Sequence, residues 1–421
     1  MRNAGFWMLA VLGATTVATG LPVWALLIAV ASAFACIGLA TGVFDVVILS
    51  ATTQRILSLM EHDLLQAMPL YVFVGLLLQR LRVADAVFAS AAWLLRGTGA
   101  GRSLAGLAVG ALVAPMNGSV ASSSALLARL VAPRLRALPA PSAVSLVSAA
   151  ATIGVVVPPS LVLILLGDVM LRAHTEASNL PGYRLAVRII NTQDVLQGAL
   201  LPALVVLVLW AIAAWIMERR TSGMRAHASA ETLKAPSATD GAIAAVAVAL
   251  MLGLLGGVFA GWLLAVEAAA TGGCLLMVGA AVSRALDRKA WAEVLLDTLA
   301  LSGALFALLI GATTFSLVFR LFGTDRLMAE AALGAPWPPQ VTAAAILLSA
   351  VACAWVLDAF EMLFVIIPVV APPLILHMGD ATQVAVLLLM VLQISFLLPP
   401  MGYAVLMARA HAGLPAVRTR K

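Results

Sequence analysis

An interrupted apolar stretch, residues 115 to 160, most constrains what this chain can fold into. It is long enough to enter a bilayer, yet both ends contain residues that break helices or compete for backbone hydrogen bonds. The first end is Pro115-Met-Asn-Gly-Ser and the second is Thr152-Ile-Gly-Val-Val-Val-Pro-Pro-Ser. Non-helical backbone survives at membrane depth only inside protein or against a water-filled cavity. The stretch therefore predicts broken helices that expose backbone groups to a ligand, as in transporters.

The same pattern recurs near the C-terminus. Gln393-Ile-Ser-Phe-Leu-Leu-Pro-Pro-Met corresponds to the motif that begins at Thr152, and the two Pro-Pro pairs begin at 158 and 399, which are 241 residues apart. This spacing also places Asn117 opposite Asp358, another polar residue in apolar sequence. We therefore predict two homologous halves, each with one interrupted hairpin and one interrupted span.

Composition defines the class of protein. The 421 residues are 63% hydrophobic and 10% charged, whereas soluble domains carry about a quarter charged residues. This predicts an all-α, polytopic integral membrane protein in a lipid bilayer. The basic residues lie at the ends of apolar segments, which argues against nucleic acid as a partner. The sequence contains no phosphate-binding glycine-rich loop with lysine and no arrangement for a nucleophile, so we do not expect an enzyme.

The predicted organisation has four parts. They are N-terminal scaffold spans (1–63), a first repeat (64–194) with a hairpin (103–136) and a broken span (142–171), central scaffold spans with a cytoplasmic loop (195–290), and a second repeat (291–421) with a hairpin (340–377) and a broken span (381–408). The distribution of lysine and arginine predicts nine spans, an N-terminus outside and a C-terminus inside. The halves are then inverted. Inverted repeats with paired broken helices are typical of alternating-access transporters.

These motifs resemble the large membrane subunit of the TRAP transporters, the tripartite ATP-independent periplasmic uptake systems of the ion transporter superfamily. The resemblance covers nearly the whole chain and rests on the motif beginning at Thr152, on Gly118-Ser119, on Leu357-Asp358 with Ile367-Pro368, and on Leu398-Pro399-Pro400. It implies an elevator-type importer in the bacterial inner membrane, with a periplasmic N-terminus and a cytoplasmic C-terminus. Sodium ions would be the coupling ions, without another cofactor. The implied partners are a small four-helix membrane subunit, a periplasmic substrate-binding protein and a small solute such as an organic acid.

The chain departs from the family pattern at three places. Asn117-Gly-Ser-Val stands where members usually have Ser-Gly-Ser-Ala, and Ser395 and Leu398 stand where Gly and Thr are usual. After Asp358, Ala-Phe-Glu replaces the Pro-Thr or Pro-Ser of many members.

A first cation site is expected at the first hairpin tip and the first broken span. Sodium is a hard ion that takes oxygen ligands, which unwound carbonyls and polar side chains supply. The expected residues are Asn117, Gly118, Ser119, Thr152, Gly154, Val157 and Pro159. The alternative is that these small and polar residues only pack helices together.

A second cation site is expected in the other half, at Leu357, Asp358, Ser395, Leu398 and Pro400. A carboxylate at membrane depth indicates function, and the alternative is that Asp358 caps the helix that follows it. We expect Ser122, Ser160 and Glu361 to contact the solute, with a structural role for Glu361 as the alternative.

Two other functions remain open from the sequence. One is a stand-alone sodium- or proton-coupled carrier of the same superfamily, which needs no binding protein. The other is a channel or passive membrane scaffold.

Overall fold

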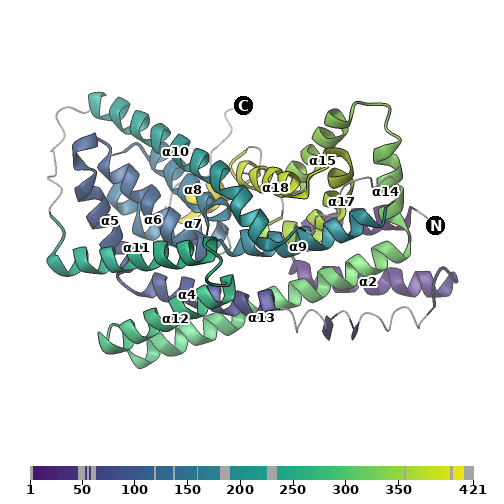
Figure 1. The fold of residues 1–421 in the computed structure, drawn as a ribbon, viewed down its shortest axis with the longest axis horizontal. Helices are drawn as coiled ribbons and strands as arrows, with labels where there is room; N and C mark the ends of the chain where they lie inside the picture. The colour runs from purple at the N-terminus through teal and green to yellow at the C-terminus, as the bar shows by residue number, and fades with distance from the viewer. Residues whose placement is uncertain are drawn as a thin grey trace.

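The structure is a computed structural model that describes residues 3–45, 53–54, 56–57, 63–117, 120–135, 138–158, 160–180, 190–224, 235–354, 357–398 and 402–411. Every regular element within these ranges is helical (Figure 1). The predicted all-α class is confirmed.

Six described helices are long and apolar enough to cross a membrane, or up to seven if α8 and α9, bent by 41° at their junction, form one span. The six lie within Val23–Ala40, Thr192–Arg220, Ala238–Phe259, Ala265–Val282, Arg288–Leu321 and Ala359–Met378. Five of the six match predicted spans, whereas Ala359–Met378 falls on the predicted second hairpin (340–377). The bent pair α8 and α9 matches the predicted first broken span, and the other three predicted spans are absent from both sets. Their helices are α1 (Ala4–Thr19) and α18 (Ala381–Ser395), which are short, and α4 (Asp63–Arg80), which has a charged residue at each end. The chain is a multi-pass helical membrane protein.

One layer of the molecule consists of long helices packed side by side (Figure 1). It contains α4, α2 (Val23–Ala40), α12 (Ala265–Val282) and α13 (Arg288–Leu321). α2 and α13 approach closely because Gly311 has no side chain: a Cβ there would lie 2.9 Å from the Trp24 carbonyl oxygen. We call this layer the frame.

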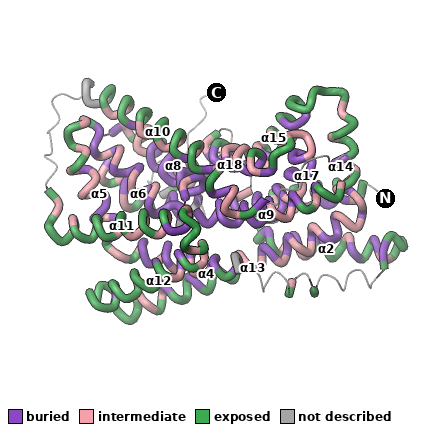
Figure 2. The backbone as a smooth tube through the Cα atoms, in the orientation of Figure 1, coloured by how far each residue is buried: buried purple, intermediate pink, exposed green. Residues whose placement is uncertain are grey.

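The opposite layer holds shorter helices with most of the buried residues (Figure 2). From the first half it contains α6 (Gly101–Asn117), α7 (Val120–Leu130), α8 (Ala140–Val156) and α9 (Leu161–Ser178). From the second half it contains α15 (Pro339–Ala354), α16 (Ala359–Glu361), a π-helical turn (Met362–Ile366), α17 (Ile367–Met378), α18 and α19 (Tyr403–His411). We call this layer the inner bundle.

Small residues hold α6 and α8 together. A Cβ on Gly110 would lie 2.7 Å from the Cβ of Ala150, and one on Gly154 would lie 2.4 Å from the carbonyl carbon of Ala114. Because the contacts advance in the same direction along both helices, α6 and α8 run parallel. The end of α6, at the predicted hairpin tip, therefore lies at the same depth as the break in α8.

The two halves pack across each other. α7, from the first half, packs against α19, and α17, from the second half, packs against α9. The ends of the helices also follow the predicted spacing. Val83 begins α5 and Thr324 begins α14, 241 residues later, as Ala140 begins α8 and Ala381 begins α18.

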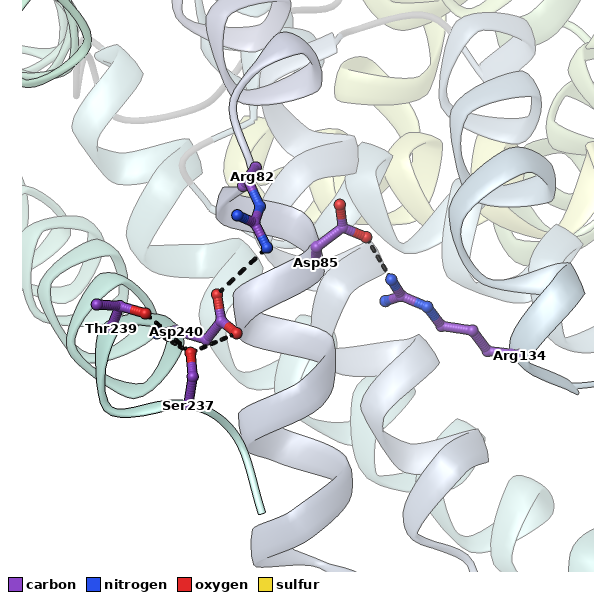
Figure 3. A network of polar contacts seen from close by, with 6 residues as sticks. All are labelled: Arg82, Asp85, Arg134, Ser237, Thr239 and Asp240. Carbon is purple, nitrogen blue, oxygen red and sulfur yellow. Dashed lines mark hydrogen bonds and ion pairs between the residues drawn. The ribbon is translucent and has the colours of Figure 1, made fainter. Parts of the chain in front are cut away.

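A polar junction links the inner bundle to the helices beside it (Figure 3). It lies on α5 (Val83–Leu94), the 3-10 turn Ala132–Leu135 and the start of α11 (Ala238–Phe259). Arg134 pairs with Asp85, and Arg82 Nη2 lies 3.9 Å from Asp240 Oδ1.

Two of the membrane-spanning candidates expose much of their apolar surface. α10 (Thr192–Met224) and α11 are largely exposed in Figure 2, and Leu201 on α10 is 71% exposed. Apolar side chains exposed on such helices suit contact with hydrocarbon or with another membrane helix.

Candidate functional site

The first helix break frees backbone carbonyls. α8 ends where the amide of Val157 donates to the Ile153 carbonyl at 3.0 Å. The next two residues, Pro158 and Pro159, have no N–H. The carbonyls four residues earlier, beginning with Gly154, therefore lose their helical donors and are able to bind a cation or a donor group.

The second break, at the end of α18, also leaves a backbone carbonyl without its helical donor. α18 ends at Ser395. In a continuing helix the carbonyl of Ser395 would accept a hydrogen bond from residue 399, but Pro399 has no N–H. The next carbonyl, that of Phe396, accepts a hydrogen bond from the amide of Ala404 at 3.1 Å. Ser395 is thus the second-half counterpart of Gly154, both in its position and in its freed carbonyl.

The two predicted broken spans meet in a buried hydrogen bond. The Nε2 of Gln393 donates to the Oγ1 of Thr152 at 3.0 Å, and Thr152 Oγ1 lies 3.0 Å from the Ala149 carbonyl, to which it donates. Both side chains are buried. The Oε1 of Gln393 has no hydrogen-bond partner in the part of the chain that the structure describes. The two residues lie 241 positions apart, so residues at equivalent positions of the predicted repeat touch.

The structure describes only part of the predicted first cation site. Gly118, Ser119 and Pro159 lie outside the described residues, as does the side chain of Asn117, whose backbone ends α6. Thr152 and Gly154 are buried in the last turns of α8, and Val157 is half-buried at its C-terminus. Gly154 lies directly against Ala114, which agrees with the alternative that the small residues of this set pack helices together.

In the predicted second site, Asp358 occupies the N-cap position of α16, and its amide donates to Glu361 Oε2 at 3.0 Å. In this hydrogen bond the Glu361 carboxylate is the acceptor, and the cation-binding and capping roles of the Asp358 carboxylate both stay predictions. Ser395 is buried and its hydroxyl donates to the Val391 carbonyl at 2.5 Å. Leu357 is half-buried, Leu398 is exposed, and Pro400 lies outside the described residues.

A cavity of about 460 Å³ lies where the inner bundle meets the frame. It brings together Ser122, Asp358 and Glu361, which the sequence assigns to ligand binding. Trp24 of α2 and Gln79 of α4 line it from the frame. We call it the inner cavity.

Ser160, also predicted to contact the solute, does not line the inner cavity. Its Oγ accepts a hydrogen bond from the Leu163 amide at 3.4 Å and caps the N-terminus of α9.

A second cavity, of about 710 Å³, lies between α9, α13 and the π-helical turn, and we call it the outer cavity. The charged side chains that line it form ion pairs. Asp168 Oδ2 lies 3.0 Å from Arg172 Nη2 within α9, and Glu176 of α9 pairs with Arg320 of α13. The second pair joins the inner bundle to the frame.

Sequence reasoning did not assign a role to Gln393, Gln79 or Trp24. The sequence did contain a signal for Gln393, because the 241-residue spacing makes it the counterpart of Thr152, a predicted site residue. The other two have no such signal, since only tertiary packing brings α2 and α4 to the inner cavity.

Comparison with known families gives one result. The family model described as "Tripartite ATP-independent periplasmic transporter, DctM component" matches residues 7–421, nearly the whole chain. No protein with curated annotation gives a significant match. The predicted family is confirmed, and members of this family work with a small TRAP membrane subunit and a periplasmic binding protein. The chain belongs to the DctM family and is the large permease component of a TRAP transporter.

Proposed function

We propose that this chain is the solute-translocating subunit of a sodium-coupled importer in the bacterial inner membrane. Its N-terminus lies in the periplasm and its C-terminus in the cytoplasm. A periplasmic binding protein delivers a small organic solute, of which organic acids are the class that the family resemblance implies. A small four-helix subunit completes the membrane complex.

The observation that carries this proposal is the meeting of the two broken spans at Thr152 and Gln393. A repeat with broken helices builds transport sites at the interface of its halves. The crossed packing of α7 on α19 and of α17 on α9 supports the same arrangement, because each hairpin rests on the broken span of the other half.

The freed carbonyls support the assignment of coupling ions. Sodium prefers oxygen ligands, and the carbonyls of Gly154 and Ser395 lie at the two breaks. Asp358, at the start of α16 in the predicted second hairpin, would add a charged oxygen. Ion binding would order the two tips, and the solute would then bind between them and the frame, in the inner cavity.

Movement of the inner bundle against the frame would carry the solute across. In the proposed orientation Gln79 of the inner cavity lies at the cytoplasmic end of α4, and Glu176 of the outer cavity lies toward the periplasmic end of α9. The Glu176–Arg320 pair joins the two layers on the periplasmic side. It would have to open when the inner bundle moves outward.

The test is uptake into proteoliposomes that contain this chain, with and without its small subunit and binding protein, under an imposed sodium gradient. The solutes are a panel of organic acids and polyols, and Asn117→Ala and Asp358→Ala are compared with the parent. Uptake that needs sodium and the binding protein, and that fails in both variants, supports the proposal. Sodium-driven uptake by this chain alone would favour the stand-alone carrier. Uptake that never exceeds equilibrium would favour a channel.

A further inference from the structure

The end of α5, the start of α6 and the end of α10 come together at one corner of the molecule (Figure 1). Two hydrogen bonds between these segments fix their positions. The Trp215 indole Nε1 donates to the Thr98 carbonyl at 3.2 Å, and the Ser103 amide donates to Glu218 Oε2 at 3.2 Å. Thr98 belongs to the 3-10 turn Arg96–Thr98, which follows α5, and Ser103 belongs to the first turn of α6.

This corner carries an excess of positive charge. Residues 93–103 and 215–220, which we call the basic corner, contain four arginines and one glutamate, a net charge of +3. Arg96, Arg219 and Arg220 are exposed, and among the described residues none of the three pairs with a carboxylate. Five other arginines of the described chain do form such pairs: Arg80, Arg82, Arg134, Arg172 and Arg320. The exposed arginines of the basic corner are thus available to an anionic ligand.

Two tryptophans orient two of these arginines. The Cζ of Arg96 lies 4.5 Å from the ring centroid of Trp93, and the Cζ of Arg219 lies 4.2 Å from that of Trp215. A guanidinium that lies over an aromatic ring keeps N–H groups with which it can bind a phosphate in a bidentate manner. Tryptophan is also typical of the membrane–water interface. The pairs therefore combine a phosphate-binding group with an interfacial one.

An exposed apolar face of α10 leads to the same arginines. Its side chains are three or four residues apart, so they share one side of the helix: Val205, Leu209, Ile212 and Ile216. Arg219 and Arg220 continue this spacing. The apolar span of α10 ends at Arg220, so the face runs from membrane depth to the interface. A lipid with its headgroup at the arginines would lay an acyl chain along this face.

We propose that the basic corner binds the headgroup of an anionic phospholipid, with an acyl chain along α10. The lipid phosphate accepts hydrogen bonds from the arginines, and each basic residue near an anionic membrane surface strengthens binding by roughly fivefold. A zwitterionic headgroup carries its own cation, which offsets this attraction. The inference rests neither on sodium coupling nor on the solute.

The test is native mass spectrometry of the chain with its small subunit, in detergent that contains equal amounts of phosphatidylglycerol and phosphatidylcholine with the same acyl chains. We expect the retained lipid to favour phosphatidylglycerol by roughly tenfold. Excess inorganic phosphate should not displace it, because phosphate gains nothing from the apolar face of α10. Displacement by phosphate would overturn the inference of a lipid site.

Two variants test the assigned residues. Arg219→Gln combined with Arg220→Gln should lower the preference for phosphatidylglycerol by about fivefold or more. Arg288→Gln combined with Lys289→Gln is the matched control, because this exposed basic pair also lies at the end of an apolar span, the start of α13, and its loss removes the same charge. Arg96→Gln, on the other segment of the basic corner, should lower the preference by about twofold to fivefold.

The outcomes are separable. A parent complex that retains both lipids equally would overturn the inference, and this result does not depend on the folding of any variant. An equal loss in the α10 pair and in the control pair would also overturn it, because net charge alone would then attract the lipid. An unchanged preference in Arg96→Gln would overturn the assignment of a site shared by the two segments.

Discussion

Replacing Thr152 by valine removes the hydroxyl that accepts the hydrogen bond of Gln393 and nearly preserves the shape of the side chain. The donor, Gln393 Nε2, then stays buried without its 3.0 Å partner. Leaving a buried polar group unsatisfied costs about 1–3 kcal/mol. We expect Thr152→Val to lower the free energy of unfolding by an amount in this range.

The reciprocal change should cost much less. Gln393→Met has a similar volume and removes both the donor and an Oε1 that has no partner among the described residues. The Thr152 hydroxyl keeps its hydrogen bond to the Ala149 carbonyl. We therefore expect a loss of about 0.5–1.5 kcal/mol at most. In the double variant, no polar group remains unpaired at this contact, so Gln393→Met should rescue Thr152→Val.

The assay is reversible unfolding of the purified chain in mixed micelles, arranged as a double-mutant cycle. Coupling energies across membrane helices average about 0.6 kcal/mol and reach about 1.7 kcal/mol; we expect the upper part of this range because both side chains are buried. Thr298→Val is the control, since that buried hydroxyl donates to Val294 within its own helix at 2.7 Å. A neutral Thr152→Val, or a double variant as unstable as Thr152→Val alone, would refute the reasoning.

Three further predictions concern packing, charge and the coupling ion. Gly154→Ala should destabilise the chain by about 1–3 kcal/mol and reduce uptake, because its Cβ would meet the Ala114 backbone at 2.4 Å; Gly253→Ala, with open space around it, is the control in the same unfolding assay in mixed micelles. Asp85→Asn should cost only about 0–1 kcal/mol, since both side chains of its pair with Arg134 are more than a third exposed, and a loss above about 2 kcal/mol would contradict this view. Replacing sodium by choline on both sides of proteoliposomes should abolish solute uptake; uptake that persists with a proton gradient would instead indicate proton coupling.

The sequence predicted the breaks well because their cause is local. Proline lacks an N–H wherever it occurs, so the Pro-Pro pair that begins at Pro158 ends α8 whatever packs around it. Repetition of the same motif placed the second break at the end of α18, which begins at Ala381, as the first broken helix begins at Ala140.

The composition of the cavities was not predictable in the same way. Trp24 and Gln79 are ordinary residues of apolar helices, and they face the inner cavity only because α2 and α4 pack beside α13. Ser160 shows the opposite case. A serine after Pro-Pro suggested solute contact, but the start of α9 needs a cap, and the hydroxyl serves that local need.

The crossed packing of α7 on α19 and of α17 on α9 bears on how the chain is made. During synthesis the first hairpin enters the membrane before its partner helix exists, and α19 is the last helix that the structure describes, ending at His411. Until then, α7 packs only on elements of its own half, such as α6 and α8, and the face that α19 covers stays open. Completion of the inner bundle therefore waits for the final segment, so a truncation before residue 403 should leave an inserted but unassembled protein that quality-control proteases remove.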